Sequence, residues 1–241
     1  MTLNEQTAAA ERSQQVYDEI NGRTSHYLDF ELAELEQSRQ YFDLSTPDLR
    51  TRRFDVLTTL VGLPIPNELQ DAVTRKLETI LGLLPDGTRM YRVRPHLLHW
   101  ESHIIRRPGE PEPPLPVDEV AEKLSAVVSE TSAFSIEYRG FFVSPDGTIA
   151  LQGYGPTAEL RARLVRELPF SSSRQNQTGH ISLARILDPV GEDAFRKLLA
   201  FRAACETETF GEMPVRRIKL VSERRWYLED HEIVREVSLK D

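Results

Sequence analysis

Cysteine is almost absent from this sequence, and its scarcity limits the kinds of site that the chain can form. Cys205 is the single cysteine among 241 residues. One thiol excludes an internal disulfide, which is typical of proteins from a reducing compartment. Cys205 falls near the end of a predicted helix over residues 192–206, so we interpret it as a buried structural thiol.

Long apolar runs are also missing. No stretch approaches the roughly 20 apolar residues that a membrane-spanning helix needs. The segment MTLNEQTAAAERSQQ at the N-terminus lacks the basic start and the apolar run of a secretory signal. We therefore expect a cytoplasmic protein without a membrane partner.

Basic residues are outnumbered by acidic ones. The chain has 30 Lys and Arg against 38 Asp and Glu, a net charge of -8. Proteins that grip a nucleic-acid duplex neutralise its phosphates with Lys and Arg, so duplex nucleic acid is not an expected partner. A small or terminal phosphate in a locally basic pocket is compatible with this charge. The G-x-x-x-x-G-K loop and a clustered Ser/His/Asp signature are absent, which disfavours NTPases and serine hydrolases.

The sequence does contain strand and helix patterns in loose alternation. Residues 1–50 are largely polar with sparse apolar positions at helical spacing, which predicts an N-terminal helical extension. Residues 51–241 combine β-branched strand patterns, amphipathic helices and a hairpin around Ser144-Pro-Asp-Gly147, and strands over 215–222 and 232–239 close this domain. This order predicts an α+β fold with mainly antiparallel sheet.

A first strand pattern, LLHWESHII, carries three polar residues at alternate positions. Successive side chains of a strand point to opposite faces, so His99, Glu101 and His103 are predicted to share one face. His103 lies about 13 Å further along the strand than His99 and is assigned a packing role.

A second strand pattern, GHISLARIL, repeats this arrangement some 80 residues later. His180 and Ser182 are predicted to share a face, and Ile181, Leu183 and Arg185 are predicted to share the opposite one. A sheet with one packed face and one functional face produces such a pattern. Arg185 is one of several arginines that could supply positive potential near the two histidines.

These two strands and their surroundings resemble the two-histidine (2H) phosphoesterase superfamily, especially its 2′,5′ RNA ligase-like and cyclic phosphodiesterase branch. GHISLAR is similar to the second signature of that family, a histidine followed by any residue, a Thr or Ser, and an apolar residue. YRVRPHLLH, which ends at His99, resembles the approach to the first signature. FSIEYRGFFVSPDGTIALQGYG resembles the hairpin of the family, and FGEMPVRRIKLVSERRWYL its closing strands. The resemblance covers about residues 53–240.

The resemblance implies two pseudo-symmetric lobes, with flanking helices, around a central cleft that receives one signature strand from each lobe. It implies hydrolysis of a 2′,3′-cyclic phosphate or a small nucleotide-derived phosphodiester without metal or other cofactor. His99 and His180 would then be the general acid and base, in an order that the sequence leaves open, and Ser182 would donate to the phosphate. The expected partner is a small nucleotide or the phosphate-bearing end of an RNA.

Glu101 departs from the first signature, because the family has Thr or Ser at this position. An ionised glutamate only accepts hydrogen bonds and would repel a phosphate oxygen. Three explanations remain open at this point: Glu101 is protonated, it orients His99 or binds a substrate hydroxyl, or the site no longer performs the family reaction.

Two other functions use the same residues. The spacing of His99, Glu101 and His103, with His180 opposite them, could serve a metal-dependent enzyme. Alternatively, the cleft could bind a nucleotide or RNA end without turnover, and Glu101 is the residue that favours this interpretation.

Overall fold

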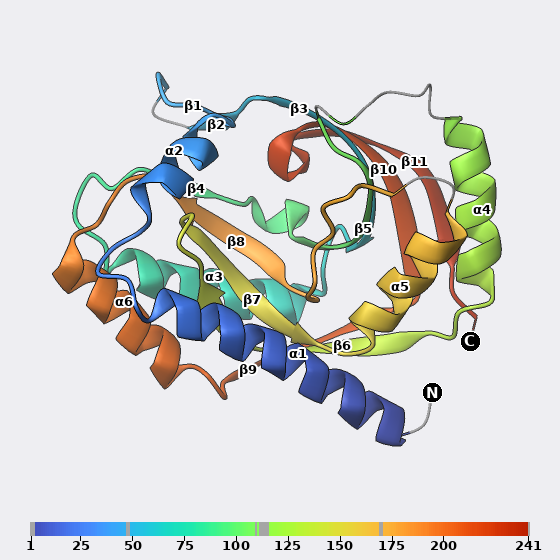
Figure 1. Cartoon of the computed structure of the whole chain (residues 1–241), viewed down its shortest axis with the longest axis horizontal. Coiled ribbons are helices and arrows are strands. Elements are labelled where there is room, and N and C mark those ends of the chain that lie inside the picture. The colour runs from blue at the N-terminus through green and yellow to red at the C-terminus, as the bar shows by residue number, and fades with distance from the viewer. Residues whose placement is uncertain (1–2, 47–48, 109, 111–115, 169–170, 241) are drawn as a thin grey trace.

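The computed structural model describes residues 3–46, 49–108, 110, 116–168 and 171–240, and it shows a mixed α+β protein (Figure 1). The predicted fold class is therefore confirmed. The α-helices are α1 (Leu3–Thr24), α2 (Leu32–Arg39), α3 (Asn67–Leu81), α4 (Val117–Ser129), α5 (Thr157–Glu167) and α6 (Glu192–Ala204). The strands are β1 (Phe42–Asp43), β2 (Arg50–Thr51), β3 (Arg53–Gly62), β4 (Met90–Arg92), β5 (His99–Arg106), β6 (Phe134–Val143), β7 (Thr148–Tyr154), β8 (Ile181–Ile186), β9 (Thr209–Val215), β10 (Arg217–Arg225) and β11 (Asp230–Ser238). Two short 3₁₀ turns are η1 (Pro95–Leu97) and η2 (Trp226–Leu228).

Two antiparallel sheets form the body of the described structure. One has the strand order β11-β10-β3-β5 and the other has the order β4-β8-β7-β6-β9. In Figure 1 the first sheet curls along the right of the molecule, while β7 and β8 cross its centre. The strand that begins with His99, β5, and the strand that directly follows His180, β8, thus belong to different sheets.

The helices α1, α3, α4, α5 and α6 each pack against strands of these two sheets. In α3, Leu69, Val73, Leu77 and Ile80 recur at helical spacing and are all buried. The helix α1 runs along β6 and β7, and its Tyr17 is fully buried (Figure 1). Among the described residues, no helix is both long enough and apolar enough to cross a membrane.

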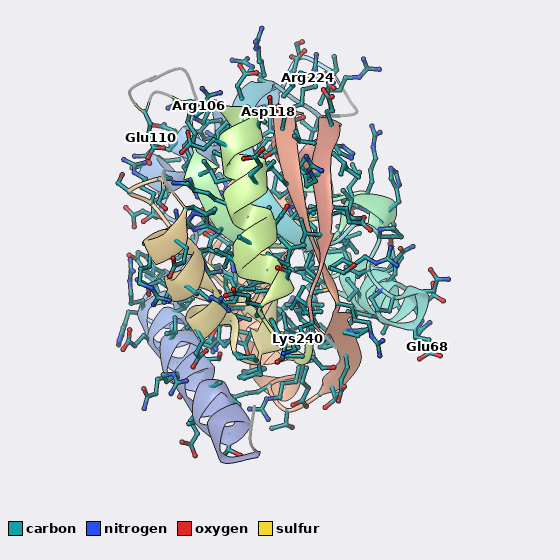
Figure 2. All side chains as sticks on the ribbon, turned by 90° about the vertical axis from the view of Figure 1, so that its right-hand side faces the viewer. Glu68, Arg106, Glu110, Asp118, Arg224 and Lys240 are labelled. Carbon is teal, nitrogen blue, oxygen red and sulfur yellow. The ribbon has the colours of Figure 1, made fainter. Side chains whose placement is uncertain are left out.

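Helix α4 packs against β11 and against α5. Figure 2 shows α4 in front, with α5 on one side of it and the strands β10 and β11 on the other. Arg106 and Asp118 lie near one end of α4, and Lys240 lies near the other end. Because α5 also packs against β5, α4 and α5 form a helical layer on this side of the molecule.

The strand prediction for residues 215–222 was wrong in one respect. The structure has two strands here, β9 and β10, and they belong to different sheets. Gly211 and Pro214 weaken the strand pattern of β9, because proline cannot donate to a sheet ladder. The fold tolerates Pro214 since β9 is an edge strand that pairs only with β6.

Candidate active site

A cavity of about 370 Å³ opens between the two sheets and receives side chains from both. The four residues that the sequence singled out, His99, Glu101, His180 and Ser182, all line it. Arg185, one of the arginines that could supply positive potential, lines it too, and its other lining residues are Tyr41, Phe54, Val56, Arg107, Phe142, Ser144, Asp146, Thr148, Asn176, Glu223, Trp226 and Tyr227.

His99 is the first residue of β5, directly after the 3₁₀ turn η1. Its Nδ1 donates a hydrogen bond of 2.7 Å to the carbonyl oxygen of Leu97, which fixes the tautomer and leaves Nε2 as the basic nitrogen. Burial lowers the pKa of His99, while the Leu97 carbonyl and the charge of Glu101 act in the opposite direction. The protonated form of His99 therefore has two stabilising partners.

His180 immediately precedes β8, in the other sheet. Its Nδ1 lies 2.8 Å from the hydroxyl of Thr178, and its ring meets the edge of Phe142 at a centroid distance of 5.5 Å. Burial, together with the positive charge of Arg161 and the proximity of His99, lowers the pKa of His180 to about 4. His180 is therefore an unprotonated base at neutral pH.

Arg161 connects the two histidine-bearing segments from behind the cavity. Its guanidinium donates to the carbonyl oxygens of Glu101 and Ser102 in β5 and of Thr178 before His180. The side chain is 6% exposed, and burial lowers the pKa of Arg161 to about 10. The sequence offered one signal for this role, because Arg161 lies on the same helix face as Leu164, where an apolar residue is expected.

Glu101 is held by two polar neighbours. The amide of Asn176 donates to Oε2 at 2.7 Å, and the hydroxyl of Thr58 lies 3.1 Å from Oε1. Both oxygens are thus engaged by the protein, so Glu101 is not placed as a phosphate donor. Its charge opposes the lowering of the pKa of His99 by burial, and within the described residues no hydrogen bond joins the two side chains.

Ser182 offers the donor that the second signature requires. Its side chain is partly exposed in the cavity wall. Its hydroxyl makes no hydrogen bond within the part of the chain that the structure describes, so it is available to a ligand.

Arg185 corrects the alternation predicted for the second strand. The sequence placed it opposite His180, yet it lines the same cavity. The reason is a bulge: Ile149 pairs with Ala184 while Ala150 pairs with Ser182, so one extra residue interrupts the alternation in β8. A bulge of this kind leaves no clear mark in the sequence.

The guanidinium of Arg185 is fixed by a buried network. It pairs with Asp146 at 2.7 Å, donates to Tyr227 and Ser38, and lies 4.7 Å from the ring centroid of Trp226. Although burial opposes ionisation, Arg185 and nearby hydroxyls lower the pKa of Asp146 to about 2. In the sequence Asp146 was visible only as part of the hairpin turn.

A second bulge corrects the prediction for His103. Leu60 pairs with Glu101 and Thr59 pairs with His103, so an extra residue in β5 places His103 on the face opposite Glu101. His103 is fully buried, its Nε2 lies 3.1 Å from the hydroxyl of Ser171, and it does not line the cavity. The predicted shared face with His99 was therefore wrong, whereas its packing role agrees with this burial.

The metal-ligand set that the sequence allowed included His103, which does not line the cavity. Within the described ranges, no group of three His, Cys, Asp or Glu side chains is arranged to hold a metal ion. The metal-dependent alternative thus finds no support in the arrangement of these side chains.

Aromatic side chains form part of the cavity wall. Tyr41, Phe54 and Trp226 contact one another, with ring centroids 4.7 Å to 5.5 Å apart. Tyr41 comes from the N-terminal segment, Phe54 from β3 and Trp226 from η2. Each of these three rings is partly exposed, so the wall offers a surface on which a planar ring can stack.

Solved structures that are similar to this chain include the following three. TT0787 of Thermus thermophilus has a TM-score of 0.52 and 19% sequence identity, covering 77% of this chain and 98% of that protein. E. coli LigT complexed with NADP+ has a TM-score of 0.50 and 13% identity, covering 78% and 99%. A conserved protein of unknown function, ATU0111 from Agrobacterium tumefaciens str. C58, has a TM-score of 0.53 and 11% identity, covering 76% and 86%.

No protein-family model matches the sequence, and no curated protein matches it. At these low identities the structural similarity shows the fold. The chain has a LigT-like fold, and the fold that the sequence resemblance implied is confirmed.

Proposed function

We propose that this protein is a 2H phosphoesterase that hydrolyses a 2′,3′-cyclic phosphate or another small nucleotide-derived phosphodiester without a metal ion. The observation that carries the proposal is the convergence of His99, His180 and Ser182 on one cavity, with one histidine from each sheet. Two imidazoles and a hydroxyl are the groups that proton transfer around a phosphodiester requires.

The electrostatics favour His180 as the general base and His99 as the general acid. His180 is neutral because burial and Arg161 destabilise its charged form, so its ring can accept a proton from the attacking water. Burial lowers the pKa of His99 on balance as well, but the Leu97 carbonyl and Glu101 oppose that shift, so the protonated form of His99 has stabilising partners. As the new bond from water to phosphorus forms, His99 gives its proton to the ribose oxygen whose bond to phosphorus breaks.

Other residues that line the cavity are suited to binding a nucleotide. The Ser182 hydroxyl can donate to a phosphoryl oxygen, and the aromatic wall of Tyr41, Phe54 and Trp226 can stack on a base. LigT, which shares the fold, has been crystallised with NADP+, a nucleotide. We therefore propose a small nucleotide or an RNA end as the partner of this cavity.

A chelator-treated hydrolysis assay tests this function. We expect wild-type protein to hydrolyse members of a panel of 2′,3′-cyclic nucleotides and short RNAs ending in a cyclic phosphate. His180→Ala should reduce the rate by ~10²-fold or more, because proton transfer by a positioned side chain typically contributes this much. His26→Ala serves as the matched control, since His26 is exposed and lies outside the cavity.

Two outcomes would contradict the proposal. One is turnover that disappears with the chelator and returns with a divalent metal. The other is binding of nucleotides by wild-type protein, lost in His180→Ala, without hydrolysis of any panel member. The second result would identify a nucleotide-binding module, the function that Glu101 favours because it replaces a phosphate donor.

A further inference from the structure

Glu223 is a buried carboxyl in the cavity that the proposed reaction does not use. It lies on β10, is 6% exposed and lines the cavity. Glu223 pairs with Val56 of β3, so it shares a face with Thr58, the residue that contacts Glu101 on β5. Three neighbouring strands thus present two carboxyl groups to the same cavity.

One carboxyl oxygen of Glu223 accepts a hydrogen bond from the protein, and within the described residues the other does not. The backbone N–H of Leu228 donates to Oε1 at 2.9 Å. Tyr227 and Leu228 have φ values of 58° and 59°, a left-handed backbone that is uncommon for non-glycine residues and that turns this N–H back towards β10. Within the described structure Oε2 makes no hydrogen bond, which leaves it for a ligand.

The surroundings of Glu223 favour its protonated form. Burial is the largest influence, and the charge of Glu101 across β3 adds to it, while the Leu228 N–H and Arg107 oppose it. The phenol of Tyr227 also faces this carboxyl from η2. On balance, burial and Glu101 raise the pKa of Glu223 to about 8, so this group is a neutral carboxylic acid at pH 7.

We infer that Glu223 is a substrate-binding residue whose carboxyl O–H, at Oε2, donates a hydrogen bond to a phosphoryl oxygen. This inference rests on the proposed function for the nature of the ligand. It explains how the site tolerates Glu101 at the place of a Thr or Ser: a hydroxyl donor is supplied from β10 instead of from β5. A neutral acid is suited to this role because it donates without adding negative charge beside a phosphate.

The ionisation of Glu223 makes phosphate binding depend on pH. Below pH 8 Glu223 is protonated and donates, and above about pH 8 it becomes a carboxylate that repels phosphate. His99 and His180 do not titrate in this range, since their pKa values are lowered from an ordinary value near 6.5. A phosphate monoester is largely dianionic above about pH 7.5, so its own charge is nearly constant there.

Calorimetric titration with adenosine 2′-monophosphate between about pH 7.5 and pH 9.5 tests the inference. We expect the Kd of wild-type protein to rise about tenfold or more over this range, the usual effect of losing a hydrogen bond to a charged group. Glu223→Gln keeps an N–H donor and should bind with little pH dependence. Glu223→Ala should bind about tenfold more weakly already at the lower pH, and Glu232→Gln, an exposed control on β11, should behave as wild type.

A ¹³C NMR titration of the glutamate carboxyl groups, assigned with Glu223→Gln, provides a readout that does not depend on turnover. A midpoint near pH 8 that rises when adenosine 2′-monophosphate binds supports the inference. Three results would overturn it. They are a midpoint below about pH 6, no binding of adenosine 2′-monophosphate at about pH 7.5, and equal pH dependence of binding by wild type and Glu223→Gln. Failure of the proposed hydrolysis with these binding results intact would leave Glu223 as a phosphate-binding residue.

Discussion

At the scale of the residue, the charge of Arg161 separates the roles of the two histidines. Burial lowers the pKa of His180 most, and the guanidinium of Arg161, which lies among three carbonyl oxygens of the histidine-bearing segments, lowers it further. His99 instead has the charge of Glu101 nearby. One buried arginine and one carboxylate thus make the two imidazoles unequal, which a sequence with two similar histidine signatures does not reveal.

The lowered pKa of His180 predicts how the rate of the reaction depends on pH. The base must be unprotonated, so kcat/KM of wild-type protein should fall as the pH is lowered through about 4, the pKa of His180. Arg161→Gln removes the positive charge and should move this limb to higher pH, whereas Arg161→Lys retains the charge and should move it less. An acidic limb at about pH 6 or above in wild-type protein would contradict the assignment of His180 as a buried base.

At the scale of the element, the sequence predicted most helices and strands and the two strands that meet at the cavity. The hairpin of β6 and β7 turns at the predicted Ser144-Pro-Asp-Gly147, because turn residues mark it in the sequence. The bulges of β5 and β8 were not predictable in this way. They decide which side of each strand faces the cavity, and they move His103 away and bring Arg185 in.

Other parts of the site depend on contacts between distant segments. Glu223 and Asp146 carry no pattern of their own, and they become functional candidates only when β10 and the hairpin turn border one cavity. Tyr41 reaches the cavity from the N-terminal segment, which the sequence resemblance did not cover. Such placements follow from tertiary packing, which local sequence patterns do not predict.

The close approach of β7 to the segment before β8 gives a prediction at the same scale. A Cβ added at Gly153 would lie 2.2 Å from the carbonyl oxygen of Gly179, the residue before His180. Gly153→Ala should therefore displace that backbone, lower stability by about 1–3 kcal/mol and reduce kcat, as urea unfolding and the hydrolysis assay would measure.

Gly22→Ala is the matched control for this substitution. Gly22 lies in α1, with nothing within 4 Å of an added Cβ, so alanine there should leave activity unchanged and slightly stabilise the helix. If Gly153→Ala kept wild-type stability and activity, the tight packing behind His180 would not be required for its position.

At the scale of the whole molecule, we propose that residues 1–50 are an extension that completes the cavity of the domain over residues 51–241. Ser38 receives a hydrogen bond from Arg185, and Tyr41 joins the aromatic wall. Tyr17 of α1 accepts a hydrogen bond from the backbone of Gly153 and packs on Phe142, the ring that borders His180. The extension thus reaches both the stacking surface and the support of one histidine.

The central claim is that two sheets each contribute one histidine to a single proton-transfer step. The most direct measurement is the chelator-treated hydrolysis rate of wild type, His99→Ala, His180→Ala and the double variant on the panel member that reacts fastest. Groups that act as a unit are strongly non-additive, so each single variant should lose ~10²-fold or more and the double variant should lose little beyond the slower single variant. Single losses that multiply in the double variant, or one histidine whose removal leaves the rate unchanged, would contradict the paired mechanism.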